Sequence, residues 1–365
     1  MKHNKYIEVL IVLLIPIIVY GIWSIFFYFY SPLIPIKDAF YYKKMAETPF
    51  DPNIMAPFCF RILTPLIAYF IPFDSGNSFF YTNFVIFILT AMLFYYFLKR
   101  LNFNKKYSIL GEIIFTAGSI TSIYLIHNFI MVDQLNQLLF LLGCYFLISK
   151  KTFKSYYTDI FFMLILAVGV LNKETILFLI PIYFILKSGP IYKKISMSIL
   201  ISCPAILIFT ILRLFIPYSG TYEELWFLFH IENLQSTLYN IFLTFGPLWF
   251  MAFFNFDCKN KFLRYSYWIL PLFIFQIILA SNIFRLIFLS FPIVIPLALL
   301  EFKKYNKEFN KIPIIIAISS QILITIMYIL KKYLELNVLN FIYFPLIVIS
   351  TTLLFIISLR LYFKQ

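Results

Sequence analysis

Charged side chains are scarce in this chain of 365 residues. Asp, Glu, Lys and Arg make up only 13% of it, whereas a soluble domain has roughly 25%. Hydrophobic residues make up 62%, and the mean hydropathy is +0.90. A chain of this composition cannot bury its apolar surface in water, and no hydrophilic stretch is long enough to form a separate soluble domain. The sequence therefore predicts a single integral membrane domain over residues 1–365.

Cysteine and histidine are also few, and the common nucleotide and metal motifs are missing. The four cysteines form no CxxC pair and there are only three histidines, so neither a disulfide framework nor a zinc site is expected. A P-loop, a dinucleotide fingerprint, a GxSxG elbow and an HExxH helix are all absent, which excludes a standard cytosolic nucleotide site. No cofactor is certain from the sequence. Use of a divalent cation stays open, because acidic residues are present but no spacing demands a metal.

The apolar residues fall into runs that are long enough for helices to cross a bilayer, which takes about 20 residues each. The fold class expected is all-α: a polytopic transmembrane helix bundle of about 11 to 13 spanning helices. The expected spans are residues 7–30, 77–98, 107–126, 134–149, 158–171, 175–187, 195–216, 237–256, 266–281, 284–301, 312–330 and 338–360. The first run is too long for a signal peptide and lacks a cleavage site, so it is expected to remain as a helix.

The basic residues orient this bundle. With the N-terminus in the cytoplasm, 21 of the 30 Lys and Arg fall on the cytoplasmic side, as the positive-inside rule predicts. Both termini are therefore expected to be cytoplasmic, in a multi-pass protein of the cell inner (cytoplasmic) membrane. The net charge of +14 needs no nucleic acid as a partner.

Three outer segments stand out between the spans. Seven prolines break residues 31–76 into short pieces, with short interfacial helices expected over 38–47 and 61–70. Residues 217–236 are expected to lie along the membrane surface as a lid, and the third group consists of tight turns.

Ionisable groups at membrane depth are costly unless paired or hydrated, so they are candidates for function. Those near the expected outer helix ends are Asp38, Arg61, Asp133, Lys173, Glu174, Arg213 and Arg285.

Each candidate has a functional and a structural interpretation. Asp38 could act as a general base at an apolar surface, or it could cap the helix that follows it. Arg61, alone among apolar residues, suits a lipid phosphate, or it reaches the headgroups without binding a ligand. Arg285 has the same two interpretations, with a carboxylate such as Asp38 as a further partner.

Two further groups lie in the expected outer turns. Asp133, with Asn128 and His127 before it, either belongs to a site or caps the fourth span. The run Asn172-Lys173-Glu174 suggests a buried ion pair, or a cation that binds a ligand phosphate while the acid holds it in place. The structural alternative for this run is a tight outer turn with incidental charges.

Several of these elements together resemble a known family. They are the acid Asp38 after one N-terminal helix, an Arg-x-Leu-x-Pro element at 61–65, Asp133, an Asn-Lys-Glu-Thr element at 172–175, and Arg285 before Phe-Pro at 291–292. The pattern resembles the multispanning membrane glycosyltransferases of the GT-C type over about residues 1–300, with residues 301–365 as additional C-terminal transmembrane helices. The paired acidic motif of several members is missing, because Ala39 follows Asp38.

The resemblance implies an enzyme that transfers a hexose or pentose from a polyprenyl-phosphate-linked sugar to a glycan, lipid or protein acceptor of the cell envelope, on the outer face of the membrane. It implies Asp38 as the catalytic residue and Arg61, Lys173 and Arg285 as ligands of the donor phosphate. Asp133, Asn172, Glu174, Asn128 and His127 are expected to support them.

Two other functions fit the same residues. A transporter or flippase of a lipid-linked saccharide would also need cations near an amphiphilic ligand, but such proteins often have internal repeats and binding groups at the midplane. No repeat is visible here, and the charges gather toward one face, which favours the enzyme. A non-catalytic membrane scaffold would retain the fold with an inert Asp38.

Overall fold

The computed structural model describes residues 2–30, 37–148, 155–221, 230–255, 258–276, 282–308, 312–334, 352–353 and 356–357. Within these ranges the chain is helical and has no β-strand; the isolated bridge between Ala56 and Thr221 lies outside any strand. The all-α class predicted from the apolar runs is therefore confirmed for the described part of the chain.

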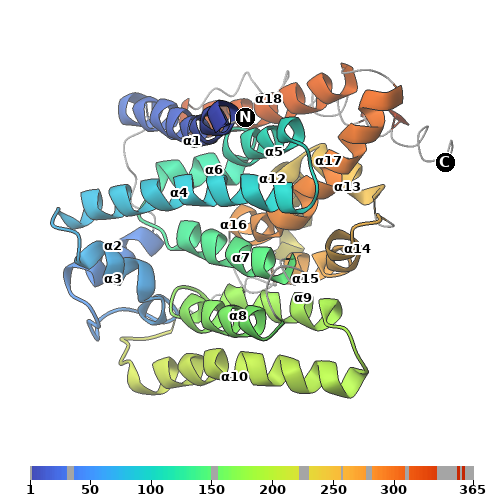
Figure 1. The fold of residues 1–365 in the computed structure, drawn as a ribbon. Helices are drawn as coiled ribbons and strands as arrows, with labels where there is room; N and C mark the ends of the chain where they lie inside the picture. Colours follow the sequence, from blue (N-terminus) through green and yellow to red (C-terminus); the bar gives the residue numbers. More distant parts are fainter. Residues whose placement is uncertain are drawn as a thin grey trace. The chain divides into compact units, whose positions relative to one another are not determined.

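The helices carry the labels of Figure 1. The α-helices are α1 (Lys2–Tyr30), α2 (Lys37–Glu47), α3 (Leu63–Tyr69), α4 (Ser75–Arg100), α5 (Lys105–Thr116), α6 (Ile120–His127), α7 (Asp133–Ile148), α8 (Ser155–Val170), α9 (Leu179–Leu186), α10 (Ile191–Phe215), α12 (Leu234–Phe245), α13 (Leu248–Phe253), α14 (Lys261–Tyr267), α15 (Leu270–Phe275), α16 (Ile283–Ile287), α17 (Phe291–Glu308) and α18 (Ile312–Leu334). The 3₁₀ turns among the described residues are η1 (Phe58–Phe60), η3 (Glu174–Phe178) and η5 (Phe288–Ser290).

In the described part of the chain, four helical stretches are long and apolar enough to cross a membrane: Tyr6–Phe29, Ser75–Arg100, Ile191–Phe215 and Ile283–Lys304. The pair α5 and α6, bent by 50°, counts as a fifth if it forms one span. These helices indicate a membrane protein. The larger count of about a dozen spans stays a prediction, because the helices at Asp133–Ile148, Tyr156–Val170, Glu174–Leu186 and Ile318–Ile329 are shorter and most of the expected span 338–360 lies outside the described residues.

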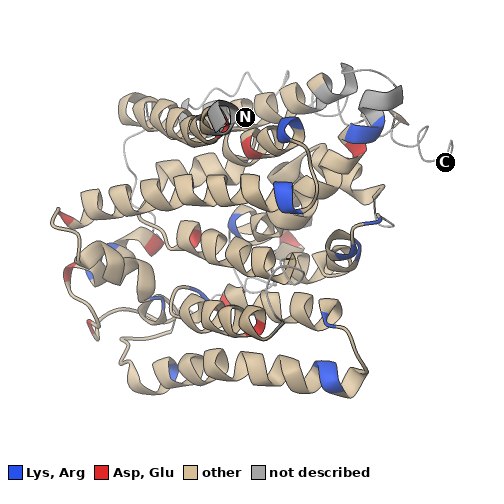
Figure 2. Cartoon of the chain, viewed as in Figure 1, with Lys and Arg blue, Asp and Glu red and all other residues tan. Residues whose placement is uncertain are grey.

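The distribution of charge along the helices agrees with membrane insertion. In α10, the basic residues Lys193 and Lys194 lie near one end and Arg213 lies near the other, and the turns between them are uncharged (Figure 2). The apolar part of this helix is also largely exposed, as at Ile199 and Leu207. An exposed apolar helix of this length is stable in a lipid environment rather than in water.

The chain divides into two compact units. The first comprises Met1–Pro32, Phe94–Tyr124 and Leu225–Gln365, and the second comprises Leu33–Leu93 and Leu125–Glu224. In the first unit, α13 packs against α17 and α12 against α16. A core of Ile120, Leu243, Phe284 and Ile324 holds this unit together.

The second unit contains most of the candidate residues. Here α8 packs against both α7 and α10 (Figure 1), and α2 packs against α3 and η1. The short helices α2 and α3 occupy the two stretches in which the sequence predicts short helices, residues 38–47 and 61–70. Whether they lie at a membrane interface stays a prediction.

Candidate functional site

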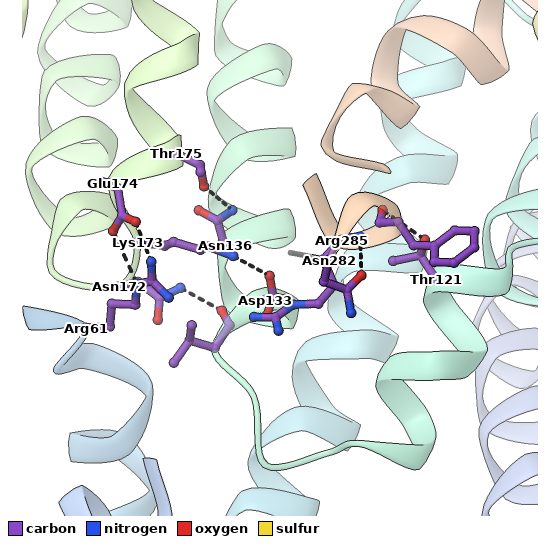
Figure 3. Close-up of polar contacts among 12 residues, drawn as sticks. Arg61, Thr121, Asp133, Asn136, Asn172, Lys173, Glu174, Thr175, Asn282 and Arg285 are labelled. Carbon is purple, nitrogen blue, oxygen red and sulfur yellow. Dashed lines mark hydrogen bonds and ion pairs between the residues drawn. The ribbon is translucent and has the colours of Figure 1, made fainter. Parts of the chain in front are cut away.

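Arg61 is held inside the second unit by hydrogen bonds from all three of its guanidinium nitrogens. It follows η1, and only 9% of its surface is exposed. Its Nε donates to Glu174 Oε2 at 3.2 Å and its Nη2 donates to Glu174 Oε1 (Figure 3), while Nη1 donates to the Tyr42 hydroxyl at 3.0 Å. The two parallel bonds to one carboxylate are the strongest arrangement available to an arginine. Arg61 is therefore fixed in place rather than free to reach lipid headgroups.

Glu174 serves as the partner of Arg61. Burial alone would raise the pKa of this carboxyl, but the adjacent guanidinium outweighs burial and holds the pKa well below its usual range. The carboxylate is then charged at neutral pH and binds protons poorly. Glu174 is consequently suited to positioning Arg61 and not to general-base catalysis.

Lys173 forms a separate ion pair. Its Nζ lies 2.7 Å from Asp133 Oδ1, and both side chains are almost fully buried, with 5% and 3% of their surfaces exposed. Asp133 is the first residue of α7. The buried pair that the sequence suggests at Lys173 therefore exists, but its acid is Asp133 and not the neighbouring Glu174.

The neighbouring amides and hydroxyls join the same segments. Asn172 is fully buried; its Oδ1 accepts from Thr64 Oγ1 at 2.5 Å and its Nδ2 donates to the Val132 carbonyl at 2.8 Å. Asn136 Nδ2 donates to Thr175 Oγ1 at 2.9 Å. We call Arg61, Asp133, Asn172, Lys173 and Glu174 the Arg61 cluster. Each residue of the 172–175 element thus has a side-chain partner, in α7, in α3 or at Arg61, which argues against an incidental turn.

Asp38 belongs to the same unit and lies in the first turn of α2. It is partly exposed. Tyr42, which accepts the hydrogen bond from Arg61, follows four residues later, so the two side chains share one face of the helix. The helix α2 also packs against η1, which precedes Arg61. It therefore carries both Asp38, the predicted base, and Tyr42, which contacts Arg61 directly.

The remaining predicted residues are also buried. His127 and Asn128 are 5% and 7% exposed at the end of α6. Arg285 is 9% exposed and belongs to the first unit, in α16. Asn282 caps this helix, accepting from the Arg285 backbone N–H at 3.3 Å. A cavity shared by Arg285 and the residues of the second unit stays a prediction.

Arg213 is a further cation that the sequence placed at an outer helix end without assigning it a role. It lies in the last turn of α10, with its Cζ 3.4 Å from the ring centre of Phe209 and 4.8 Å from that of Phe60. Phe60 directly precedes Arg61 in the chain. In the part of the chain that the structure describes, no carboxylate forms a salt bridge with Arg213. Its guanidinium is therefore held by two aromatic rings with donors left for a ligand.

The segment after α10 is hydrogen-bonded to the loop that precedes η1. The Ala56 N–H donates to the Gly220 carbonyl at 2.9 Å, and the Ser219 N–H donates to the Ile54 carbonyl at 3.2 Å. The chain that leaves α10 is thereby bound to the loop that leads to Arg61. Tyr42 could have been found from the sequence by its helical spacing from Asp38, but no local signal pointed to the rings beside Arg213.

The close approach of α8 to the 172–175 element leads to the first prediction. A Cβ added at Gly169 would lie 2.5 Å from Ile176 Cγ1 and 3.1 Å from its Cβ, and the Cβ of Ile176 moves only with its backbone. We expect Gly169→Ala to lower the free energy of unfolding by about 1–3 kcal/mol, the usual cost of overpacking. Thermal or detergent unfolding of the full chain measures this.

Gly21→Ala is the matched control, because a Cβ at Gly21 has no atom within 4 Å and alanine favours a helix. An equal loss of stability in both variants would contradict the packing explanation for Gly169.

Among the described residues, no group of three or more His, Cys, Asp or Glu side chains could hold a metal ion. Comparison of the chain with protein-family models, with curated proteins and with solved structures gave no match. The fold thus assigns the chain to a broad class, the helical membrane proteins. The resemblance to GT-C glycosyltransferases stays a hypothesis that depends on the residues described above.

Proposed function

We propose that this protein is a membrane glycosyltransferase that transfers a sugar from a polyprenyl-phosphate donor to a hydroxyl of an envelope glycan, lipid or protein on the outer face. One observation supports this most directly. The second unit combines the Arg61 cluster with Arg213, a partly exposed arginine that forms no salt bridge among the described residues.

The balance of charge favours an anionic ligand. Arg61 and Lys173 each face one carboxylate, Glu174 and Asp133, so those two pairs are neutral overall. Arg213 adds a positive charge without an acid of its own. An arginine presents a planar fork of donors that matches a phosphate, so the phosphate of the lipid donor is the ligand that this arrangement suits. In this proposal Arg213 contacts the phosphate, and the neutral pairs formed by Arg61 and Lys173 hold the surrounding segments in place.

The proposed reaction is a single displacement. The Asp38 carboxylate takes the proton of the acceptor hydroxyl as its oxygen bonds to the anomeric carbon. The bond between that carbon and the phosphate oxygen breaks, and its electron pair leaves with the polyprenyl phosphate. Arg213 stabilises the charge that develops on the departing phosphate. No second acid is required, because a phosphate is a good leaving group.

The second prediction tests this directly. The full chain in lipid nanodiscs is titrated with a polyprenyl phosphate, and binding is measured for the wild type and for Arg213→Gln. We expect the variant to bind about ten- to a hundredfold more weakly, the loss expected when a hydrogen bond between charged groups is removed. Sugar transfer is measured with a radiolabelled polyprenyl-phosphate sugar. The assay follows the release of polyprenyl phosphate and the appearance of label in the acceptor.

Lys194→Gln is the matched control, since Lys194 is also on α10 and also lies near an aromatic ring, 6.0 Å from the centre of Phe184. Equal losses for Arg213→Gln and Lys194→Gln would indicate nonspecific attraction and contradict the proposed site. Movement of the intact lipid-linked sugar across the bilayer without cleavage would identify a transporter instead.

A further inference from the structure

The first unit contains an apolar cavity that the proposed reaction does not use. It has a volume of about 380 Å³. One wall is formed by Trp249, Ala252 and Phe253 of α13, and the other by residues from the end of α14 to Ile274 of α15. Phe253 and Trp268 line it and are 60% and 66% exposed, so the cavity opens to the surface of the unit.

A proline lies at the break between α14 and α15 and lines this cavity. Pro271 is the second residue of α15 and has no N–H to donate to the Tyr267 carbonyl, where α14 ends. The chain turns instead through short-range bonds, with Ile269 N–H to the Ser266 carbonyl at 3.0 Å and Leu272 N–H to the Ile269 carbonyl at 2.9 Å. The expected span 266–281 is thus interrupted, and the break leaves space against α13.

The lining indicates what the cavity can bind. Its walls are aromatic and aliphatic, and the indole Nε1 of Trp249 is already used, donating to the Ile241 carbonyl at 3.0 Å. Such walls offer little to a sugar or to ordered water, both of which need several polar partners. A hydrocarbon chain suits them.

Two cations precede the cavity on one face of α14. Lys261, Arg264 and Trp268 are three and then four residues apart, a spacing that aligns side chains along a helix. Lys261 Nζ and Arg264 Cζ lie 5.9 Å and 5.3 Å from the centre of the same Tyr265 ring, so both charges lie beside one aromatic side chain. The face therefore combines a positive end with the apolar cavity.

We propose that this face binds an anionic phospholipid, with an acyl chain in the cavity and the phosphate against Lys261 and Arg264. The complementary charge favours an anionic over a zwitterionic lipid. The proposal concerns the first unit alone and does not depend on the proposed glycosyltransferase activity.

The test uses the purified full chain in a mild detergent. It is titrated with phosphatidylglycerol whose acyl chains carry bromine, which quenches tryptophan fluorescence on contact, and in parallel with brominated phosphatidylcholine. We expect saturable quenching by phosphatidylglycerol at lower mole fractions than by phosphatidylcholine. Trp249→Phe with Trp268→Phe, which leaves only Trp23 and Trp226, should remove the saturable part.

Charge and volume variants complete the test. Lys261→Gln with Arg264→Gln should raise the half-saturating phosphatidylglycerol concentration about thirtyfold, as expected for two basic contacts with an anionic headgroup. Lys193→Gln with Lys194→Gln, the same charge loss in the second unit, should leave it unchanged. Ala252→Phe should fill the cavity and abolish saturation; if this variant does not fold, the two charge variants decide.

Three results would overturn the proposal. They are equal quenching by both phospholipids, equal effects of the two charge variants, and displacement of the brominated lipid by polyprenyl phosphate but not by unlabelled phosphatidylglycerol. None of these readouts involves sugar transfer, so they are independent of the outcome at the second unit.

Discussion

Asp38→Asn is expected to lower turnover about a hundred- to ten-thousandfold, the usual contribution of a positioned general base. Asparagine has the shape of aspartate but cannot accept the proton of an acceptor hydroxyl. Binding of polyprenyl phosphate should be retained, because in the proposed site the phosphate contacts belong to Arg213 and not to Asp38. Single-turnover transfer from a radiolabelled donor, measured beside donor binding on the same preparation, separates the two effects.

Asp74→Asn is the control for Asp38. Asp74 lies in the same outer segment, and its Oδ2 accepts from the Asn77 backbone N–H at 3.1 Å, so its role at the start of α4 is structural. This variant should keep wild-type turnover. Full activity of Asp38→Asn would contradict the role of Asp38 as the base, and a protein without turnover in any form would support the scaffold.

The positions of helices were predicted well where the residues of the segment itself determine them. The short helices expected over 38–47 and 61–70 were found as α2 and α3. Pro35 and Pro49 flank the first of them, and Pro65 lies in the first turn of the second, where a proline is tolerated. The interruption of the span expected over 237–256 was missed. There Gly246 adopts a positive φ of 51° and ends α12, a conformation that a run of apolar residues does not indicate.

The candidate residues could be predicted more easily than their partners. Lys173 and Glu174 are neighbours, and the sequence suggested that they act together. The backbone at Lys173 is extended, with φ −164° and ψ 134°, and side chains on an extended chain alternate in direction. Lys173 therefore meets Asp133, 40 residues away, and Glu174 meets Arg61, 113 residues away. Pairings at such separations depend on the packing of α7, α8 and η3, which local patterns do not specify.

Lys173→Met is expected to lower the free energy of unfolding by about 3–5 kcal/mol, the usual cost of removing one partner from a buried ion pair. Asp133 would keep its charge in a place where only 3% of its side chain is exposed. The double variant Lys173→Met with Asp133→Leu removes both charges and should recover much of the loss, since apolar replacements of a buried pair are often neutral. Unfolding of the full chain in mixed detergent and SDS gives all three values.

The pair formed by Lys187 and Asp159 is the matched control. Its Nζ to Oδ2 distance is also 2.7 Å, but its side chains are 12% and 13% exposed, so water can compensate a lone carboxylate more readily. Lys187→Met should therefore cost less than Lys173→Met. If Lys173→Met instead leaves stability unchanged and weakens only the binding of polyprenyl phosphate, the lysine acts on the ligand and its pairing with Asp133 is incidental. A loss of stability without ligand present means that the pair holds η3 against α7, and Lys173 then contributes to binding by fixing the position of Glu174 and Arg61.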